Sequence, residues 1–199
     1  MGRILEIFKK ILTDVLTSVY EPFWFAVILA VLFMAVWNSA HKSGWKEIFL
    51  EWVTNFRRDQ VFRRTFFCVL YTALILFRTL LNRTIWENPL SDVLGNWQIF
   101  QDNGEFNAEP MENVLLFIPF IILLFWAERE NLLGKKKGFV AVVGRSVGIG
   151  VCFSLGIESA HLVLRLGTFE SFDILYNKAG AMSGGGVNWA GKKVIETLR

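Results

Sequence analysis

Long apolar runs alternate with short charged segments along the chain, and this pattern predicts an all-α integral membrane protein. A helix needs roughly 20 apolar residues in succession to cross a bilayer. Four runs approach or exceed that length with few charges: residues 22–40, 66–81, 113–127 and 139–164. We expect each of them to span the membrane.

A fifth span is expected at residues 172–190, although hydropathy alone would not identify it. The segment contains Asp173, Asn177 and Lys178, and three consecutive glycines follow at 184–186. Polar groups are tolerated at membrane depth only where protein or a wet cavity shields them from lipid. We therefore expect neighbouring helices to shelter this segment, which gives about five transmembrane helices in all.

Two other segments are apolar on one helical face only. Residues 3–20 and 45–64 place large apolar side chains at helical spacing, opposite charged ones. Such amphipathic helices typically lie along a membrane surface. The expected organisation is an N-terminal part over residues 1–64, a transmembrane bundle over residues 65–190 and a tail over residues 191–199.

The lysines and arginines predict which side of the membrane each connection faces. Most of them lie in residues 41–64, 129–138 and 188–199, whereas the connection 82–112 is acidic and has the single basic residue Arg83. Basic connections usually face the cytoplasm. We expect the N-terminus outside, the C-terminus in the cytoplasm and the acidic connection outside.

Composition supports a membrane protein and argues against other classes. Apolar residues make up 53% of the 199 residues, and the mean hydropathy is +0.41. The net charge is only +3, and the basic residues do not form a stripe that could follow a phosphate backbone, so nucleic acid is not an expected partner. Cys68 and Cys152 lie in apolar runs without metal-ligand spacing, so we expect buried thiols and neither a metal nor another cofactor.

Small and cyclic residues predict local features of the bundle. The motifs Gly144-x-x-x-Gly148 and Gly180-x-x-x-Gly184 are typical of helices that approach closely. Asn113 suits the N-cap of the span at 113–127, and Pro119 predicts a kink within it.

Ionisable residues near the outer ends of the predicted spans suggest a site. Glu158, His161 and Arg165 are spaced i, i+3 and i+7, and Asp173 and Asn177 are spaced i, i+4, so each set shares one helical face. A charge at membrane depth usually is paired or faces a wet cavity. We expect the two stripes to converge, together with Arg78, in an outward-facing polar pocket.

The order of these residues resembles the VanZ-like family of bacterial membrane proteins. The resemblance rests on three stretches, Asn113–Pro119, Ser154–His161 and Arg165–Gly180, and runs from about residue 79 to about residue 184, which leaves the first span outside it. It implies a multi-pass protein of the bacterial cytoplasmic membrane that contributes to teicoplanin-type glycopeptide resistance.

The candidate ligand-binding residues unite the two stripes with the polar positions of the family pattern. They are Arg78, Arg83, Asn113, Glu158, His161, Arg165, Glu170, Asp173 and Asn177. The family usually has glutamine where His161 stands and a second aspartate where Phe172 stands. A role that needs two adjacent carboxylates is therefore not expected to transfer.

Three functions and one purely structural role fit this pattern. The preferred function is the binding of a polar lipid headgroup or a lipid-linked cell-wall precursor. The second is an intramembrane enzyme that modifies an envelope lipid with Glu158 or His161 as the general base. The third is a lipid transporter or flippase, which often shows internal repeats. Alternatively, Glu158 and an arginine could form an ion pair that only fixes the bundle. A homo-oligomer is also compatible with the sequence.

Overall fold

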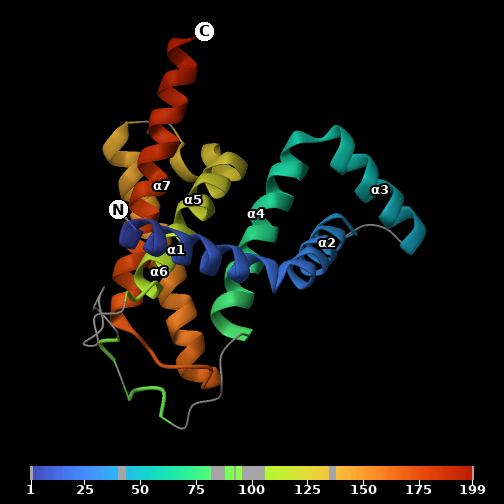
Figure 1. The fold of residues 1–199 in the computed structure, drawn as a ribbon. Helices are drawn as coiled ribbons and strands as arrows, with labels where there is room; N and C mark the ends of the chain where they lie inside the picture. The colour runs from blue at the N-terminus through green and yellow to red at the C-terminus, as the bar shows by residue number, and fades with distance from the viewer. Residues whose placement is uncertain are drawn as a thin grey trace.

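The computed structural model describes residues 2–39, 44–81, 88–91, 93–95, 106–134 and 138–198. Seven α-helices and one π-helical turn account for most of these residues, with no strand among them (Figure 1). In chain order they are α1 (Gly2–Tyr20), α2 (Phe23–Ser39), α3 (Trp45–Arg58), α4 (Gln60–Leu76), η1 (Phe77–Leu81), α5 (Glu109–Leu133), α6 (Phe139–Leu164) and α7 (Ser171–Thr197). The predicted all-α fold is confirmed.

Three helices in the described part of the chain are long and apolar enough to cross a membrane. They cover Gln60–Leu80, Glu109–Leu133 and Phe139–Leu164, and they correspond to three of the four long apolar runs. The apolar helix at Phe23–Trp37 is shorter, and α7 is not among the three. The helices suit a membrane protein, whereas the total of five spans stays a prediction.

The amphipathic segment predicted at residues 45–64 is divided between two helices. α3 ends at Arg58, and Asp59 caps the next helix, because its Oδ1 atom accepts a hydrogen bond of 2.8 Å from the backbone N–H of Val61. The prediction of one helix through residue 64 was wrong, since it gave no weight to the capping preference of aspartate. Residues 60–64 instead lengthen α4.

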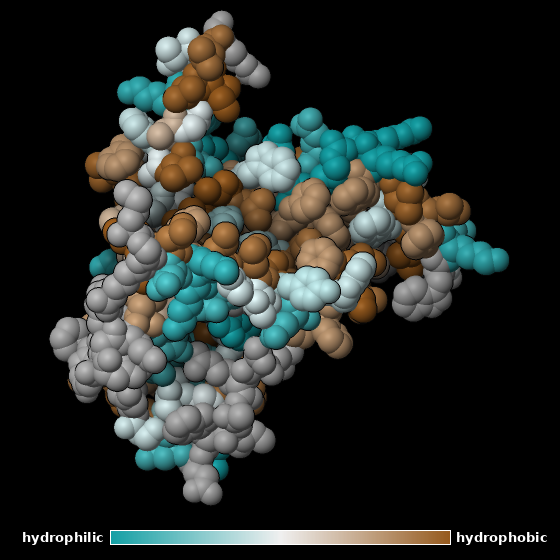
Figure 2. Space-filling view, in the orientation of Figure 1, coloured by the Kyte–Doolittle hydropathy of each residue, from teal (hydrophilic) through white to brown (hydrophobic). Residues whose placement is uncertain are grey.

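α2 buries one narrow face and leaves the rest of its apolar surface exposed. Ala26, Ala30 and Met34, which share one face at i, i+4 and i+8, are buried against α4, whereas Trp24 and Trp37 are exposed. Figure 2 shows apolar side chains over this part of the molecule and hydrophilic ones at the arch where α3 meets α4. Such an apolar surface is suited to contact with lipid.

α7 is the central helix of a three-helix bundle with α5 and α6 (Figure 1). It runs parallel to α5, so that Gly180 lies beside Val114 and Gly184 lies beside Ile118. A Cβ atom at position 184 would lie 2.8 Å from the carbonyl oxygen of Ile118, a distance that side chains do not tolerate. The glycines therefore allow the backbones of α5 and α7 to approach closely.

The other predicted glycine motif does not act in this way. A Cβ atom at Gly144 or Gly148 would meet nothing within 4 Å, so the prediction of a packing motif at these positions was wrong. α6 runs antiparallel to α7 and turns Gly150 towards Ala181 instead. Gly185 completes this contact beside Ser146, where an added Cβ atom would lie 2.8 Å from the serine Cβ atom.

The same orientation of α6 decides the environment of the second cysteine. Gly150 and Ser154 are buried, and Cys152, which lies between them on the opposite face, is exposed. Cys68 in α4 is buried, as the sequence predicts. The expectation that Cys152 is buried was wrong.

α5 begins earlier and bends later than the sequence indicates. Its first residue is Glu109, so Asn113 lies inside the helix and does not cap it. Pro119 is within α5, but the residue with non-helical angles is Glu128 (φ −122°, ψ 23°). Tyr71 of α4 donates a 3.1 Å hydrogen bond to the carbonyl oxygen of Leu116, one turn before the proline.

Candidate functional site

Glu158 and His161 form a buried pair on one face of α6. The two residues are 1% and 2% exposed, and the Nδ1 atom of His161 lies 3.3 Å from the Oε2 atom of Glu158. The Nε2 atom of the same ring lies 2.8 Å from the carbonyl oxygen of Thr79 in η1. The last carbonyls of a helix have no partner within it, so the imidazole satisfies one carbonyl of the neighbouring element.

The two contacts of His161 determine where its protons can lie. A carbonyl oxygen only accepts hydrogen bonds, so Nε2 carries a hydrogen and donates it to Thr79. The Nδ1 atom faces Oε2 of Glu158, so a proton on Nδ1 would join the ring to the carboxylate.

The connection between α6 and α7 also contacts this carboxyl group. The backbone N–H of Glu170 donates to Oε2 of Glu158 at 3.0 Å, while the Glu170 side chain accepts a 2.7 Å hydrogen bond from Thr168. The backbone N–H of Ser171 donates to the carbonyl oxygen of Val93 at 2.9 Å. Part of the connection that precedes α5 thus lies along this end of the bundle.

Two amide side chains connect α7 to its neighbours. Asn113 of α5 donates a 2.7 Å hydrogen bond to Oδ1 of Asp173, and Asn177 donates a 2.8 Å hydrogen bond to the hydroxyl of Ser154 in α6. The second polar atom of Asn177, Oδ1, is buried and has no hydrogen-bond partner in the described part of the molecule. Whichever way the amide is turned, one of its polar atoms stays unpaired there.

Arg78 is paired with an acid that the sequence analysis did not select. Its Nη2 atom lies 2.8 Å from Oε2 of Glu112 at the start of α5, and the two side chains are 33% and 10% exposed. The sequence offers a signal for Glu112, because this residue directly precedes Asn113, but the other acidic residues of the connection 82–112 obscure it. This pair joins η1 to α5 beside the Asn113–Asp173 contact.

Arg165 lies outside the group that these contacts bring together. α6 ends at Leu164, and Arg165 adopts the left-handed conformation (φ 56°) with an exposed side chain. Its backbone N–H donates to the carbonyl oxygen of His161, whereas its side chain makes no hydrogen bond or ion pair with any described residue. Arg83 lies outside the described residues.

A comparison with known protein families identifies the family of the chain. The VanZ/LLP1 family model matches residues 18–190. The chain belongs to this family. The match confirms the resemblance to VanZ-like proteins and extends it to α2, which the sequence analysis had left outside. No curated protein and no solved structure matches the chain.

In this VanZ/LLP1 family member, the polar residues form a buried base and a half-buried rim. Glu158, His161 and Asn177 are buried, whereas Arg78 and Asp173 are partly exposed. All of them lie at the end of the bundle where α5 and α7 begin. We call this group, together with Asn113, Glu112 and Glu170, the polar cluster. The geometry offers acceptors, one cation and a buried imidazole–carboxyl contact in a poorly solvated setting, which is suited to holding a polar group.

In the VanZ/LLP1 chain, the polar cluster is also hydrogen-bonded to residues that the sequence did not indicate as binding residues. Thr79 contributes a backbone carbonyl, Ser154 accepts from Asn177, and Thr168 holds Glu170. A backbone carbonyl leaves no sequence signal, and single hydroxyl residues are too common to select. Within the described chain, no three His, Cys, Asp or Glu side chains gather closely enough to hold a metal ion.

Proposed function

We propose that this VanZ-like membrane protein contributes to teicoplanin-type glycopeptide resistance by binding a polar lipid headgroup or a lipid-linked cell-wall precursor at the polar cluster. The observation that carries the proposal is the half-buried rim of Arg78, Asn113 and Asp173 next to buried polar groups. Membership of the VanZ/LLP1 family supports it as well.

The groups of the polar cluster suit the chemistry of such a ligand. A headgroup ammonium, a sugar hydroxyl or a peptide amide could donate to the carboxylate of Asp173 or to Oδ1 of Asn177, which is buried and lacks a partner among the described residues. The exposed guanidinium of Arg165 could contact a phosphate at the entrance. Hydrogen bonds to charged groups are stronger than those between neutral groups, and the low dielectric of the site strengthens them further.

Susceptibility of cells to teicoplanin tests this proposal. Glu158→Gln and Asp173→Asn are nearly isosteric changes that remove the charge of the base and of the rim, so we expect both variants to accumulate in membranes and to lose protection. Lys178→Gln, an exposed neighbour on α7, is the matched control and should protect like the wild type. Protection by Asp173→Asn at the wild-type level would refute the proposal.

A second function, modification of an envelope lipid, is favoured by the buried contact between the His161 ring and the Glu158 carboxyl group. General acid–base catalysis requires a group that gains and loses a proton within reach of the reacting atom. The hydroxyl of Ser154 accepts a hydrogen bond from Asn177, and the His161 ring contacts Glu158 and Thr79. Incubation of the purified protein with envelope lipids, followed by mass spectrometry, would reveal a product only if this second function is correct.

A further inference from the structure

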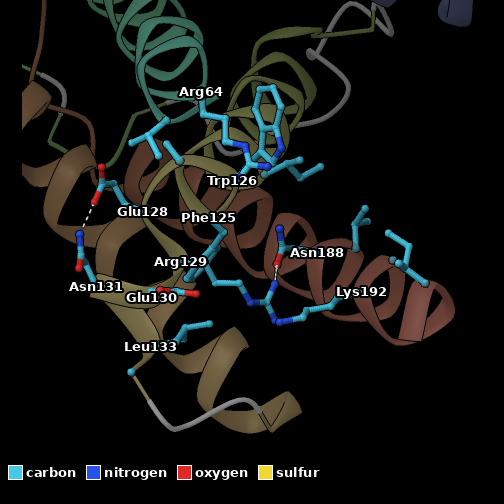
Figure 3. Close-up of a pocket in the computed structure, with 17 residues that line it drawn as sticks. Arg64, Phe125, Trp126, Glu128, Arg129, Glu130, Asn131, Leu133, Asn188 and Lys192 are labelled. Atoms are coloured by element: carbon cyan, nitrogen blue, oxygen red, sulfur yellow. Dashed lines mark hydrogen bonds between the residues drawn. The ribbon is translucent and has the colours of Figure 1, made fainter. Parts of the chain in front are cut away.

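A cavity lies at the opposite end of the bundle from the polar cluster. It has a volume of about 1000 Å³ and is lined by the start of α4 and by the C-terminal parts of α5 and α7 (Figure 3). Ile122, Phe125 and Val187 contribute apolar walls, and two arginines and a lysine, Arg64, Arg129 and Lys192, contribute positive charge. The cavity is therefore both apolar and cationic.

Arg129 is held in place and still has an unused donor. Its Nη1 atom donates to Oδ1 of Asn188 in α7. Its Nε atom is buried and has no hydrogen-bond partner within the described residues. A buried donor without a partner is unfavourable, and a guanidinium presents its donors in a planar fork that matches the oxygens of a phosphate. The guanidinium of Arg129 therefore lines the cavity and has a donor that the described residues leave unused.

The acidic residues of the lining do not neutralise this corner. Glu128 accepts a 2.6 Å hydrogen bond from Asn131, and Figure 3 shows these two side chains on the other side of α5 from Asn188 and Lys192. Glu130 is exposed to solvent. The helical break at Glu128 lies directly before Arg129. Lys192 lies 3.8 Å from Glu196, but this pair is exposed and solvent weakens it, so Lys192 and Arg129 still supply positive charge where α5 faces α7.

The position of the cavity along α7 indicates where its occupant comes from. Asp173 of the polar cluster and Lys192 of the cavity are ~28 Å apart along the helix at ~1.5 Å per residue. The hydrocarbon core of a bilayer is about 30 Å thick. When the polar cluster lies at one boundary of the hydrocarbon core, the cavity lies near the other boundary, next to the headgroups of that leaflet.

We propose that this cavity binds the phosphate group of an anionic phospholipid, with Arg129 and Lys192 as its contacts and with an acyl chain along the apolar wall of Ile122 and Val187. Arg64 marks the far side of the site, where its guanidinium lies 5.4 Å from the ring of Trp126. The site is separate from the polar cluster, and the proposal does not depend on the function of that cluster.

Native mass spectrometry of the full-length protein in detergent tests the proposal, with titrations of phosphatidylglycerol, phosphatidylcholine and inorganic phosphate. We expect phosphatidylglycerol to bind at concentrations about tenfold lower than phosphatidylcholine. Arg129→Gln and Lys192→Gln should each abolish most of this roughly tenfold preference for phosphatidylglycerol. The matched controls are Lys193→Gln, whose ammonium lies 5.0 Å from the ring of Trp189 outside the cavity lining, and Arg145→Gln on the exposed face of α6. Both controls should keep the preference.

Three outcomes would overturn the proposal. Equal binding of the two lipids by the wild type would show that the cavity does not select an anion. An equal loss in the Lys193→Gln control would assign the preference to general surface charge. Displacement of phosphatidylglycerol by millimolar inorganic phosphate would identify a free anion as the occupant. Because Lys192 is partly exposed, the Lys192→Gln variant should fold even if Arg129→Gln does not. The elution volume in size-exclusion chromatography and the circular dichroism spectrum would verify the folding of each variant.

Discussion

The imidazole of His161 joins two helical elements, because its Nδ1 atom lies 3.3 Å from the Glu158 carboxyl group in α6 while its Nε2 atom lies 2.8 Å from the Thr79 carbonyl in η1. Both partners are acceptors when the carboxyl group is ionised. The ring is therefore the donor that connects them, and its removal affects both.

Replacement of His161 distinguishes this connecting role from simple space filling. His161→Leu leaves the carboxyl group and the Thr79 carbonyl without this partner, so we expect a loss of about 2–4 kcal/mol of stability. His161→Gln restores the residue that is usual in the family and keeps a donor, so it should lose less than about 1.5 kcal/mol. Thermal unfolding in detergent measures both, and a leucine variant as stable as the wild type would contradict the role.

The glycine contact between α5 and α7 predicts a sharp contrast between two pairs of substitutions. Gly180→Ala and Gly184→Ala place a methyl group against the backbone of α5, where the neighbouring atoms cannot yield, so each should lower stability by about 2 kcal/mol or more. Gly144→Ala and Gly148→Ala meet open space and should be neutral or stabilising by about 0.5–1 kcal/mol. The same unfolding assay compares the four variants. Similar effects in both pairs would argue against the close approach.

Arg165 allows stability and ligand binding to be separated. Its left-handed backbone conformation is unfavourable for a residue with a Cβ atom by roughly 1–2 kcal/mol, and glycine adopts it freely. We expect Arg165→Gly to keep or slightly raise the unfolding temperature while it removes the cation that the proposed function assigns to a bound phosphate. If teicoplanin protection persists in this variant, Arg165 has no part in binding.

The ion pair between Arg78 and Glu112 should contribute modestly to stability. The pair is 2.8 Å long but partly exposed, so solvent weakens it. In a double-mutant cycle with Arg78→Ala and Glu112→Ala, we expect a coupling energy of about 1 kcal/mol. A coupling near zero would show that the two residues act independently.

The sequence was sufficient for elements whose signal is local. The apolar run at 139–164 gives both ends of α6, and the spacing of Glu158 and His161 places them correctly on one face. By contrast, the start of α5 was placed too late, because its real signal is Glu109 followed by Pro110, a combination favourable in the first turn of a helix.

The contacts of the polar cluster needed the three-dimensional structure. Periodicity relates residues within one helix, but it does not give the distance between Arg78 and Glu112 or the position of the Glu170 backbone N–H. Arg165 shows a second limit. The i, i+7 spacing places it on the same face as Glu158 only if the helix continues, but α6 ends at Leu164. The orientation in the membrane and the ligand stay predictions.

Because α7 is one uninterrupted rod, it carries groups of both ends on a single rigid body: Asp173 and Asn177 near its beginning, Asn188 and Lys192 further along. α5 is joined to this helix near both ends, by the Asn113–Asp173 and the Arg129–Asn188 hydrogen bonds. A displacement of α7 along its axis would therefore move its polar-cluster residues and its cavity residues together.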